Sequence, residues 1–178
     1  MTVTGELLKR NQAHAEHHPG RASSLVPSLQ TVLVTCCDHR VDPAHVLGLR
    51  LDEAVVIRNE GGRVTPDVVR TLTTLATVAL VENLDLDVEI VVMHHTDCGT
   101  SRLARPEHAA LAAQIFGVSE DELDAKHLAD PTAAVRADLQ VLRHTPLIPA
   151  DLRLTGLVYD VATGTVNRVG ESAEPAAD

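Results

Sequence analysis

The stretch LQTVLVTCCDHR, residues 29–40, decides how the rest of the chain is understood. Its first eight residues are almost continuously apolar and rich in β-branched side chains, which is typical of a strand buried on both faces of a parallel sheet. Two adjacent cysteines, an acid, a histidine and an arginine follow within five positions. The stretch therefore predicts a strand over 29–36 that ends in a group of chemically active side chains.

Two further apolar runs resemble this first one. Residues 53–59 and 87–95 predict strands, and a long helical pattern over 65–84 lies between them. Thr65 can cap that helix, with Pro66 in its first turn. A shorter helical pattern over 42–49 separates the first two strands. Strands that alternate with helices are typical of α/β proteins with a parallel sheet.

The second half of the chain also predicts helices and strands. Residues 107–116 and 130–145 read as helices, with Asp130 as the cap of the second one. Alternating residues over 152–169, interrupted by a Thr-Gly turn at 163–164, predict a hairpin. A polar helix over 6–16 is marginal by itself and is expected to pack on a neighbouring surface.

These patterns predict an α/β fold: a mostly parallel central β-sheet of about four to five strands, flanked by α-helices, with an N-terminal helical extension. We expect one domain over residues 1–170, in which 1–25 form a helical arm, and a disordered tail over 171–178. The sequence shows neither an internal repeat nor an interdomain linker.

The net charge argues against two classes of partner. A charge of −10 disfavours nucleic acid, whose phosphates attract Lys and Arg, and it disfavours anionic lipid surfaces. The chain has no apolar run of the ~20 residues that a membrane span needs, and its first 20 residues lack the hydrophobic core of a signal peptide. We therefore expect a cytoplasmic protein, whose three cysteines serve metal binding or catalysis rather than disulfides.

Ligands bind at the carboxyl ends of the strands in a parallel sheet. The predicted strands deliver Cys36 to one such end and His95 to another, and Cys98 follows three residues after His95. Neighbouring strands lie ~4.8 Å apart, so these side chains can meet if the two strands are adjacent. Two thiolates and one imidazole suit tetrahedral zinc and leave one position for solvent.

Two questions stay open at this point. Successive side chains of a strand point to opposite faces, so either Cys36 or Cys37 can face the metal, but not both. The three cysteines could also be core packing, because free cysteine is among the most buried residue types.

The motifs CCDHR (36–40) and HHTDCG (94–99) together resemble the paired signature of the β-class carbonic anhydrases, Cys-x-Asp-x-Arg followed by His-x-x-Cys-Gly. VIRNEGG (56–62) resembles the family's Arg-Asn-Ala-Gly segment, and GLVYDVATG (156–164) resembles its carboxyl-terminal strand. The resemblance covers most of residues 29–169 and is nearest to the short bacterial branch of the family. It implies that Cys36 is a ligand and that Cys37 is the variable position.

The resemblance also implies an activity and an assembly. One zinc ion per chain, held by Cys36, His95 and Cys98, would support the reversible hydration of carbon dioxide to bicarbonate by a zinc-bound hydroxide. The family implies a homodimer or a dimer of dimers, in which the amino-terminal helix reaches across to the partner. Carbon dioxide and bicarbonate would then be the small-molecule partners.

Asp38 and Arg40 are the expected catalytic pair. Asp38 lies two residues beyond Cys36, so its side chain leaves the strand on the same side, where it can accept a hydrogen bond from the hydroxide. Arg40 can hold that carboxylate in a bidentate contact. In some members of the family this Asp swings onto zinc as a fourth ligand at lower pH. The alternative is a surface ion pair of small energetic value.

The remaining predictions concern residues around the site. Asn59, Gly61, Gly62 and Gly99 are expected to form its backbone and pocket, the glycines by permitting tight turns. His94 is expected to be a satisfied core residue and Asp97 to orient the loop or the histidine ring. Glu60 departs from the family's usual Ala and could pair with Arg58 or Arg63.

Two other functions remain alternatives. Some relatives of the short branch hydrolyse carbonyl sulfide or carbon disulfide, and the zinc motif does not separate these activities from carbon dioxide hydration. A protein with structural zinc and no turnover is the third possibility, and it would need a further side chain such as Cys37 in the fourth position.

Overall fold

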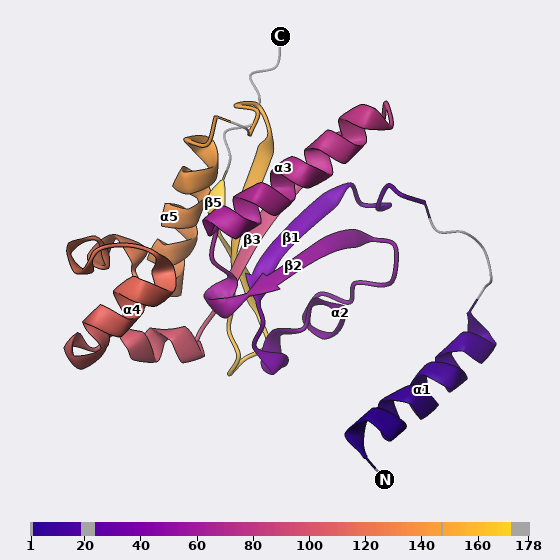
Figure 1. Cartoon of the computed structure of the whole chain (residues 1–178), viewed down its shortest axis with the longest axis horizontal. Helices are drawn as coiled ribbons and strands as arrows, with labels where there is room; N and C mark the ends of the chain where they lie inside the picture. Colours follow the sequence, from indigo (N-terminus) through magenta and orange to yellow (C-terminus); the bar gives the residue numbers. More distant parts are fainter. Residues whose placement is uncertain (1, 19–23, 147, 172–178) are drawn as a thin grey trace.

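The computed structural model describes residues 2–18, 24–146 and 148–171, and a five-stranded sheet lies at its centre (Figure 1). The spatial order of the strands is β2-β1-β3-β4-β5, in which the first four are parallel and β5 is antiparallel to β4. The predicted α/β class and mostly parallel sheet are therefore confirmed. The strands are β1 (Thr31–Cys36), β2 (Ala54–Asn59), β3 (Glu89–His95), β4 (Arg153–Tyr159) and β5 (Val166–Glu171).

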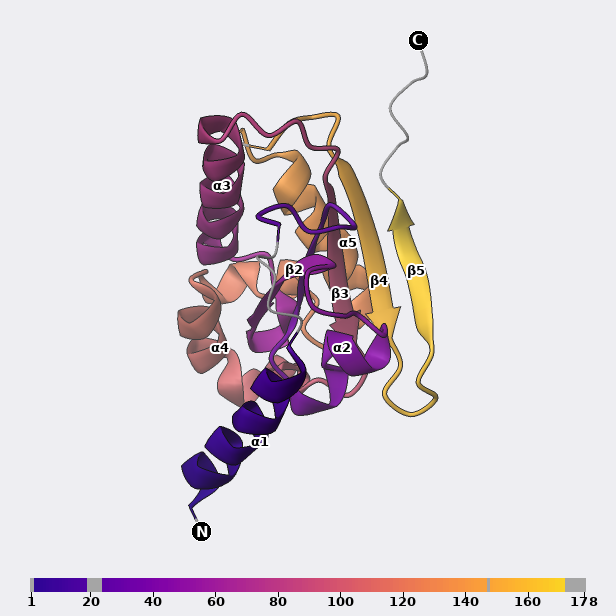
Figure 2. The ribbon, with the colours of Figure 1, turned by 90° about the vertical axis from the view of Figure 1, so that its right-hand side faces the viewer.

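Helices α2, α3, α4 and α5 lie in the connections between the strands, and α3 and α5 pack against the sheet, whereas α1 precedes β1 (Figure 2). A short 3₁₀ turn is the first helical element after each of the strands β1, β2 and β3. The α-helices are α1 (Val3–His17), α2 (Pro43–Val46), α3 (Pro66–Val81), α4 (Ala109–Phe116) and α5 (Pro131–Arg143). The 3₁₀ turns are η1 (His39–Val41), η2 (Glu60–Gly62), η3 (Gly99–Ala104), η4 (Pro106–His108), η5 (Glu120–Glu122) and η6 (Asp124–Lys126).

Local sequence signals place the helix starts. Thr65 accepts a hydrogen bond from the backbone N–H of Val68, and Asp130 accepts from Thr132 and Ala133, so both predicted caps are present. Proline follows each cap at the first helical position, where its missing N–H costs nothing.

The apolar core lies between the central strands and two helices. Val34 of β1 and Val92 of β3 face each other in register and are fully buried. Helices α3 and α5 contribute Leu72 and Val135 to the same cluster. Because β1 and β3 are adjacent and parallel, Cys36 and His95 reach the same edge of the sheet, as the site requires.

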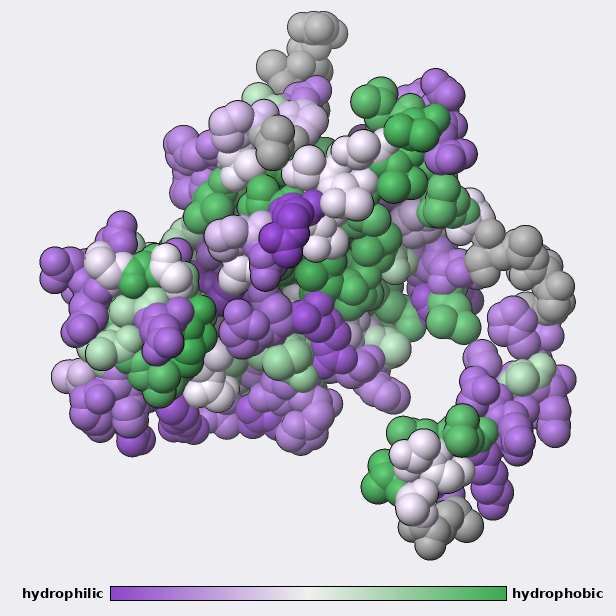
Figure 3. All heavy atoms as spheres, in the orientation of Figure 1, coloured by the Kyte–Doolittle hydropathy of each residue, from purple (hydrophilic) through white to green (hydrophobic). Residues whose placement is uncertain are grey.

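Helix α1 stands away from this core (Figure 1). It begins three residues earlier than predicted, because Thr2 caps the backbone N–H of Gly5. None of its side chains is buried, and Val3, Leu7 and Leu8 are exposed. Figure 3 shows apolar atoms in the open at the end of α1 nearest the N-terminus. This helix thus presents an apolar surface that its own chain does not cover within the described residues.

The predicted arm and tail lie only partly within the described residues. Glu171, the first residue of the predicted tail, is the last residue of β5. Residues 172–178, and residues 19–23 of the predicted arm, lie outside the described part of the chain. Over the described residues, we find no helix with both the length and the apolar character that crossing a membrane requires.

Candidate metal centre

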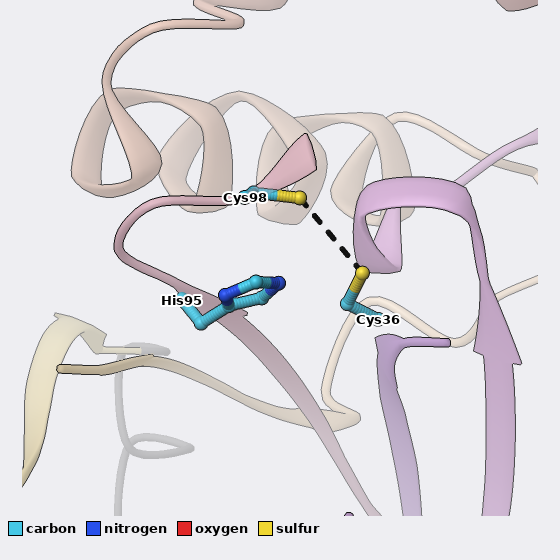
Figure 4. Close-up of side chains that lie close together, drawn as sticks. All are labelled: Cys36, His95 and Cys98. Carbon is cyan, nitrogen blue, oxygen red and sulfur yellow. Dashed lines mark hydrogen bonds between the residues drawn. The ribbon is translucent and has the colours of Figure 1, made fainter. Parts of the chain in front are cut away.

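Cys36, His95 and Cys98 come together at the carboxyl edge of the sheet. Cys36 ends β1, His95 ends β3, and Cys98 follows on the loop that leaves β3. Their ligand atoms all lie within 4.8 Å of one another. Figure 4 shows the three side chains pointing toward a common centre. The convergence that the sequence predicted is therefore what the structure shows.

The spacing of these donors fits zinc. Cys36 Sγ and Cys98 Sγ are 3.8 Å apart. Two sulfurs that each lie ~2.3 Å from one tetrahedral ion would be separated by roughly this distance. The hydrogen bond between the two sulfurs raises the pKa of the Cys36 thiol, which burial raises further, and it lowers the pKa of Cys98. A divalent ion would stabilise both thiolates together.

The histidine is oriented as a ligand. Its Nδ1 lies 2.9 Å from the Thr96 carbonyl oxygen, which can only accept, so Nδ1 carries the proton. The lone pair is then on Nε2, which faces the cysteines. Among the buried side-chain nitrogen and oxygen atoms of the described residues, His95 Nε2 is the one without a hydrogen-bond partner. A buried acceptor nitrogen without a hydrogen-bond partner is what we expect of a histidine that binds a metal ion.

The structure separates the two adjacent cysteines. Cys36 is buried inside the cluster, whereas Cys37 is exposed and takes no part in it. The strand geometry explains the difference, since the backbone N–H of Cys37 continues the β1–β2 ladder with a 2.8 Å bond to the Asn59 carbonyl.

Asp38 and Arg40 form a bidentate ion pair beside the cluster. Arg40 donates from Nε and Nη2 to the two Asp38 oxygens, at 3.0 and 2.7 Å. These bonds hold the pKa of Asp38 well below its usual range, so the carboxylate is ionised at neutral pH. The backbone N–H of Asp38 also donates to Cys36 Sγ at 3.4 Å, which ties the pair to the metal centre.

Arg40 has a second carboxylate partner that the sequence did not reveal. Its Nη1 donates to Asp97 Oδ2 at 3.0 Å, and its Nη2 donates to the Asp97 carbonyl at 2.9 Å. Asp97 is also paired with Arg102. The loop role that we expected for Asp97 thus takes a definite form: its carboxylate contacts Arg40 rather than the ring of His95.

Arg58 and Asn59 anchor the loops around the site. Arg58 donates to the carbonyl oxygens of Cys36 and Asp38, at 3.0 and 2.8 Å, and pairs with Asp42. The Asn59 side chain both donates to and accepts from the backbone of Arg63, at 2.8 and 2.9 Å. The Asn59 side chain therefore links the two ends of η2, since Asn59 precedes this turn and Arg63 follows it.

Two of the three predicted glycines meet the expectation. Gly61 and Gly62 have φ values of 75° and 69°, in the left-handed region that favours glycine. A Cβ on Gly62 would lie 2.8 Å from the backbone nitrogen of Cys36, so only glycine lets η2 approach the site this closely. Gly99 has open space around it and no positive φ, so the turn argument fails there.

Glu60 is exposed at the start of η2. The arginines with which we expected it to pair have other carboxylate partners: Arg58 binds Asp42 and Arg63 binds Asp138.

A buried polar network behind the site was missed. Arg63 donates to both oxygens of Asp138, at 2.8 and 2.9 Å, and the His94 ring lies 3.1 Å from the same carboxylate. All three side chains are buried, and His94 is satisfied as expected. One signal was available, since Asp138 lies on the buried face of α5 between Val135 and Leu142.

The cavities distinguish the site from the rest of the surface. A hollow of about 50 Å³ lies against His95 and Cys98, and its lining also includes Thr100, Leu128 and Ala134. A larger hollow of about 590 Å³ lies between α5 and the β4–β5 hairpin and contains none of the predicted site residues. Of these two hollows, only the small one adjoins the cluster, at His95 and Cys98.

Comparison with known proteins agrees with this geometry. The family model described as carbonic anhydrase matches residues 31–166, which include the three residues of the cluster, Asp38 and Arg40. The chain belongs to the β-carbonic anhydrase family. It is 33% identical over 169 residues to β-carbonic anhydrase 1 of Mycobacterium tuberculosis, an alignment that covers 95% of this chain and 99% of the relative.

Two further relatives of this family member bear on its activity. The carbonic anhydrase of Streptococcus mutans has a crystal structure that matches with a TM-score of 0.74 at 37% identity, over 96% of this chain and 99% of that one. A carbon disulfide hydrolase from Acidianus sp. is 32% identical over 154 residues, which cover 74% of this chain and 72% of that protein.

Proposed function

We propose that this β-carbonic anhydrase hydrates carbon dioxide reversibly to bicarbonate at one zinc ion per chain, held by Cys36, His95 and Cys98. The observation that supports this most directly is the donor set: two sulfurs 3.8 Å apart and one buried imidazole nitrogen that lacks any other partner among the described residues. Three protein ligands are typical of catalytic zinc, which keeps its fourth position for water.

Zinc in this site would supply acidity, lowering the pKa of water from 15.7 to ~7. The chain's own contribution is to orient the attacking water. Because Asp38 is ionised, it can only accept hydrogen bonds, and it fixes the direction of an O–H group next to Cys36. Arg40 keeps that carboxylate charged and aimed. The reaction adds the water's oxygen to carbon dioxide and releases one proton to the solvent.

The variant Asp38→Asn tests this role. It keeps the shape of the side chain but cannot be ionised, and it presents an amide to Arg40. We expect the hydration rate to fall about 100-fold or more, the range typical of positioned acid–base groups. Zinc content should stay at one per chain, because all three ligands are intact. Stopped-flow hydration with zinc quantified by elemental analysis measures both quantities.

Cys37→Ser is the matched control at the neighbouring position. Cys37 is exposed and outside the cluster, so zinc and activity should be unchanged. Loss of zinc from Cys37→Ser would contradict the assigned ligand set, and full activity in Asp38→Asn would contradict the role of the carboxylate.

Carbon disulfide hydrolysis is the second candidate, favoured by the similarity to the Acidianus enzyme. The same purified, zinc-loaded protein separates the two activities. Carbon dioxide hydration acidifies the solution, whereas carbon disulfide hydrolysis releases hydrogen sulfide. Sulfide release that exceeds bicarbonate formation under matched conditions would favour the second candidate. Structural zinc without turnover is less favoured, because Cys37 does not enter the cluster.

We also propose a cytoplasmic homodimer, or a dimer of such dimers, in which α1 packs on the partner. The support is that α1 buries no side chain of its own while Val3, Leu7 and Leu8 are exposed. Unpaired thiols at Cys36 and Cys98, which zinc needs, suit a reducing compartment.

Removal of residues 1–18 should therefore lower the oligomeric state. Sedimentation of the full chain should give at least twice the 19.0 kDa chain mass, and the truncated protein should give a smaller assembly. Lys9→Ala, on the same helix, is the control that changes no apolar contact. A full-length monomer at micromolar concentration would contradict the proposed dimer.

A further inference from the structure

We propose that Asp97 and Arg102 are positioning residues: they hold Arg40 so that Asp38 stays on Arg40 and away from the metal. The inference deepens the proposed function and rests on its zinc site. It assigns a role to a chain of four alternating charges, Asp38, Arg40, Asp97 and Arg102, which starts at the metal centre and runs outward to the surface.

The two carboxylates bind different edges of one guanidinium. Asp38 takes the edge formed by Nε and Nη2, whereas Asp97 takes Nη1 through its carboxylate and Nη2 through its carbonyl. They therefore do not compete for the same protons. Because a guanidinium is planar and rigid, fixing one edge also fixes the direction of the other.

Arg40 needs this second anchor. It lies on the short turn η1, and its side chain is more than one-third exposed. An arginine that is free to move loses substantial rotamer entropy whenever it is held in one place. With Asp97 in place, part of that ordering precedes the contact with Asp38, so the Asp38–Arg40 pair forms more readily.

The backbone of Asp97 has a left-handed conformation. Its φ is +52°, a left-handed conformation that non-glycine residues adopt uncommonly. The side chain and the carbonyl of this residue both face Arg40 as a result. Arg102 contacts the remaining Asp97 oxygen, so the Asp97 carboxylate is held by one arginine at each oxygen. The two aspartates and two arginines together carry no net charge.

Asp38 has two possible partners, Arg40 and the metal ion. It is two residues from Cys36, and a carboxylate is a common zinc ligand, so it has an alternative partner if Arg40 moves away. Asp97 and Arg102 favour the arrangement in which Asp38 is paired. Weakening them should raise the fraction of molecules in which Asp38 occupies the metal.

The test is thiocyanate binding to the cobalt(II)-loaded protein, followed by visible absorption. In Asp97→Asn the backbone is preserved, because Asn tolerates the left-handed region. Thiocyanate must then displace Asp38 from a larger fraction of molecules, so its apparent Kd should rise at least about fivefold. Simple electrostatics predicts the opposite sign, since removing a negative charge near the site should strengthen anion binding.

A double variant isolates the path through Asp38. In the Asp38→Asn background, Asp97→Asn should leave the thiocyanate Kd unchanged or lower it, because no carboxylate remains to take the metal. Arg102→Gln should act in the same direction as Asp97→Asn but less strongly. Asp87→Asn is the matched control: it breaks an exposed pair with Arg153 at the opposite end of β3 and should have no effect.

Two results would overturn the inference. One is a thiocyanate Kd that is unchanged or lower in Asp97→Asn. The other is a weakening that persists equally in the Asp38→Asn background. The titration uses no carbon dioxide, so a protein that behaves as expected here but shows no hydration would lose the proposed function alone. A protein that binds no cobalt would contradict both the inference and the proposed function.

Discussion

Replacing Cys36 with alanine should strip the protein of zinc and lower carbon dioxide hydration by at least about three orders of magnitude, because water that is not bound to the metal keeps a pKa of 15.7 instead of ~7. Alanine leaves two protein ligands where catalytic zinc needs three. Cys36 is buried and small, so the loss of its sulfur should disturb packing little. Elemental analysis and stopped-flow hydration measure the two effects.

Cys37→Ala is the sharpest control that the chain offers. The two thiols are adjacent in the sequence, yet only Cys36 lies in the cluster with His95 and Cys98. The control should therefore keep zinc and turnover. If both variants lost zinc, or if only Cys37→Ala did, the assignment of the ligands would be wrong.

Zinc removal gives a second readout that does not depend on turnover. An ion that binds the folded state and not the unfolded state adds stability, so a chelator should lower the melting temperature of the wild-type protein. The same chelator should leave the melting temperature of Cys36→Ala unchanged. A chelator effect of equal size in both proteins would place the stabilising metal elsewhere.

The metal centre was predictable because its parts follow local rules. Apolar runs that end at Cys36 and His95 indicate buried strands, and the carboxyl ends of parallel strands meet at one edge. Alternation along β1 then allows only one of two adjacent cysteines to face the site. Local signals also fixed the starts of α3 and α5, at Thr65 and Asp130.

Contacts between distant segments were not predictable in the same way. Arg40 meets Asp97 across 57 residues and Arg63 meets Asp138 across 75, and no local pattern pairs them. The left-handed backbone of Asp97 shows no sequence signal either. The sequence also did not separate Gly99 from Gly61 and Gly62, because a glycine in a motif looks the same whether or not its φ is positive.

Asp138 provides the second large effect. Asp138→Ala should lower the free energy of unfolding by about 3–5 kcal/mol, because it leaves the charge of Arg63 buried without its carboxylate. The backbone N–H of Val64 and the His94 ring lose the same acceptor. Urea denaturation measures the change. Asp67→Ala is the matched control: it breaks an exposed Asp–Arg pair on α3 and should cost ~1 kcal/mol or less.

The pH dependence distinguishes a lost charge pair from lost packing. Burial favours the neutral form of Asp138, but hydrogen bonds from His94 and Arg63 outweigh it, so the pKa lies below the ordinary value of 3.8. A lowered pKa contributes stability that is complete above 3.8 and is lost as the pH falls through the folded-state value. The difference in stability between wild type and Asp138→Asn should therefore narrow in acid. A difference that stays constant from pH 7 to pH 3 would mean that the carboxylate's charge does not stabilise the fold.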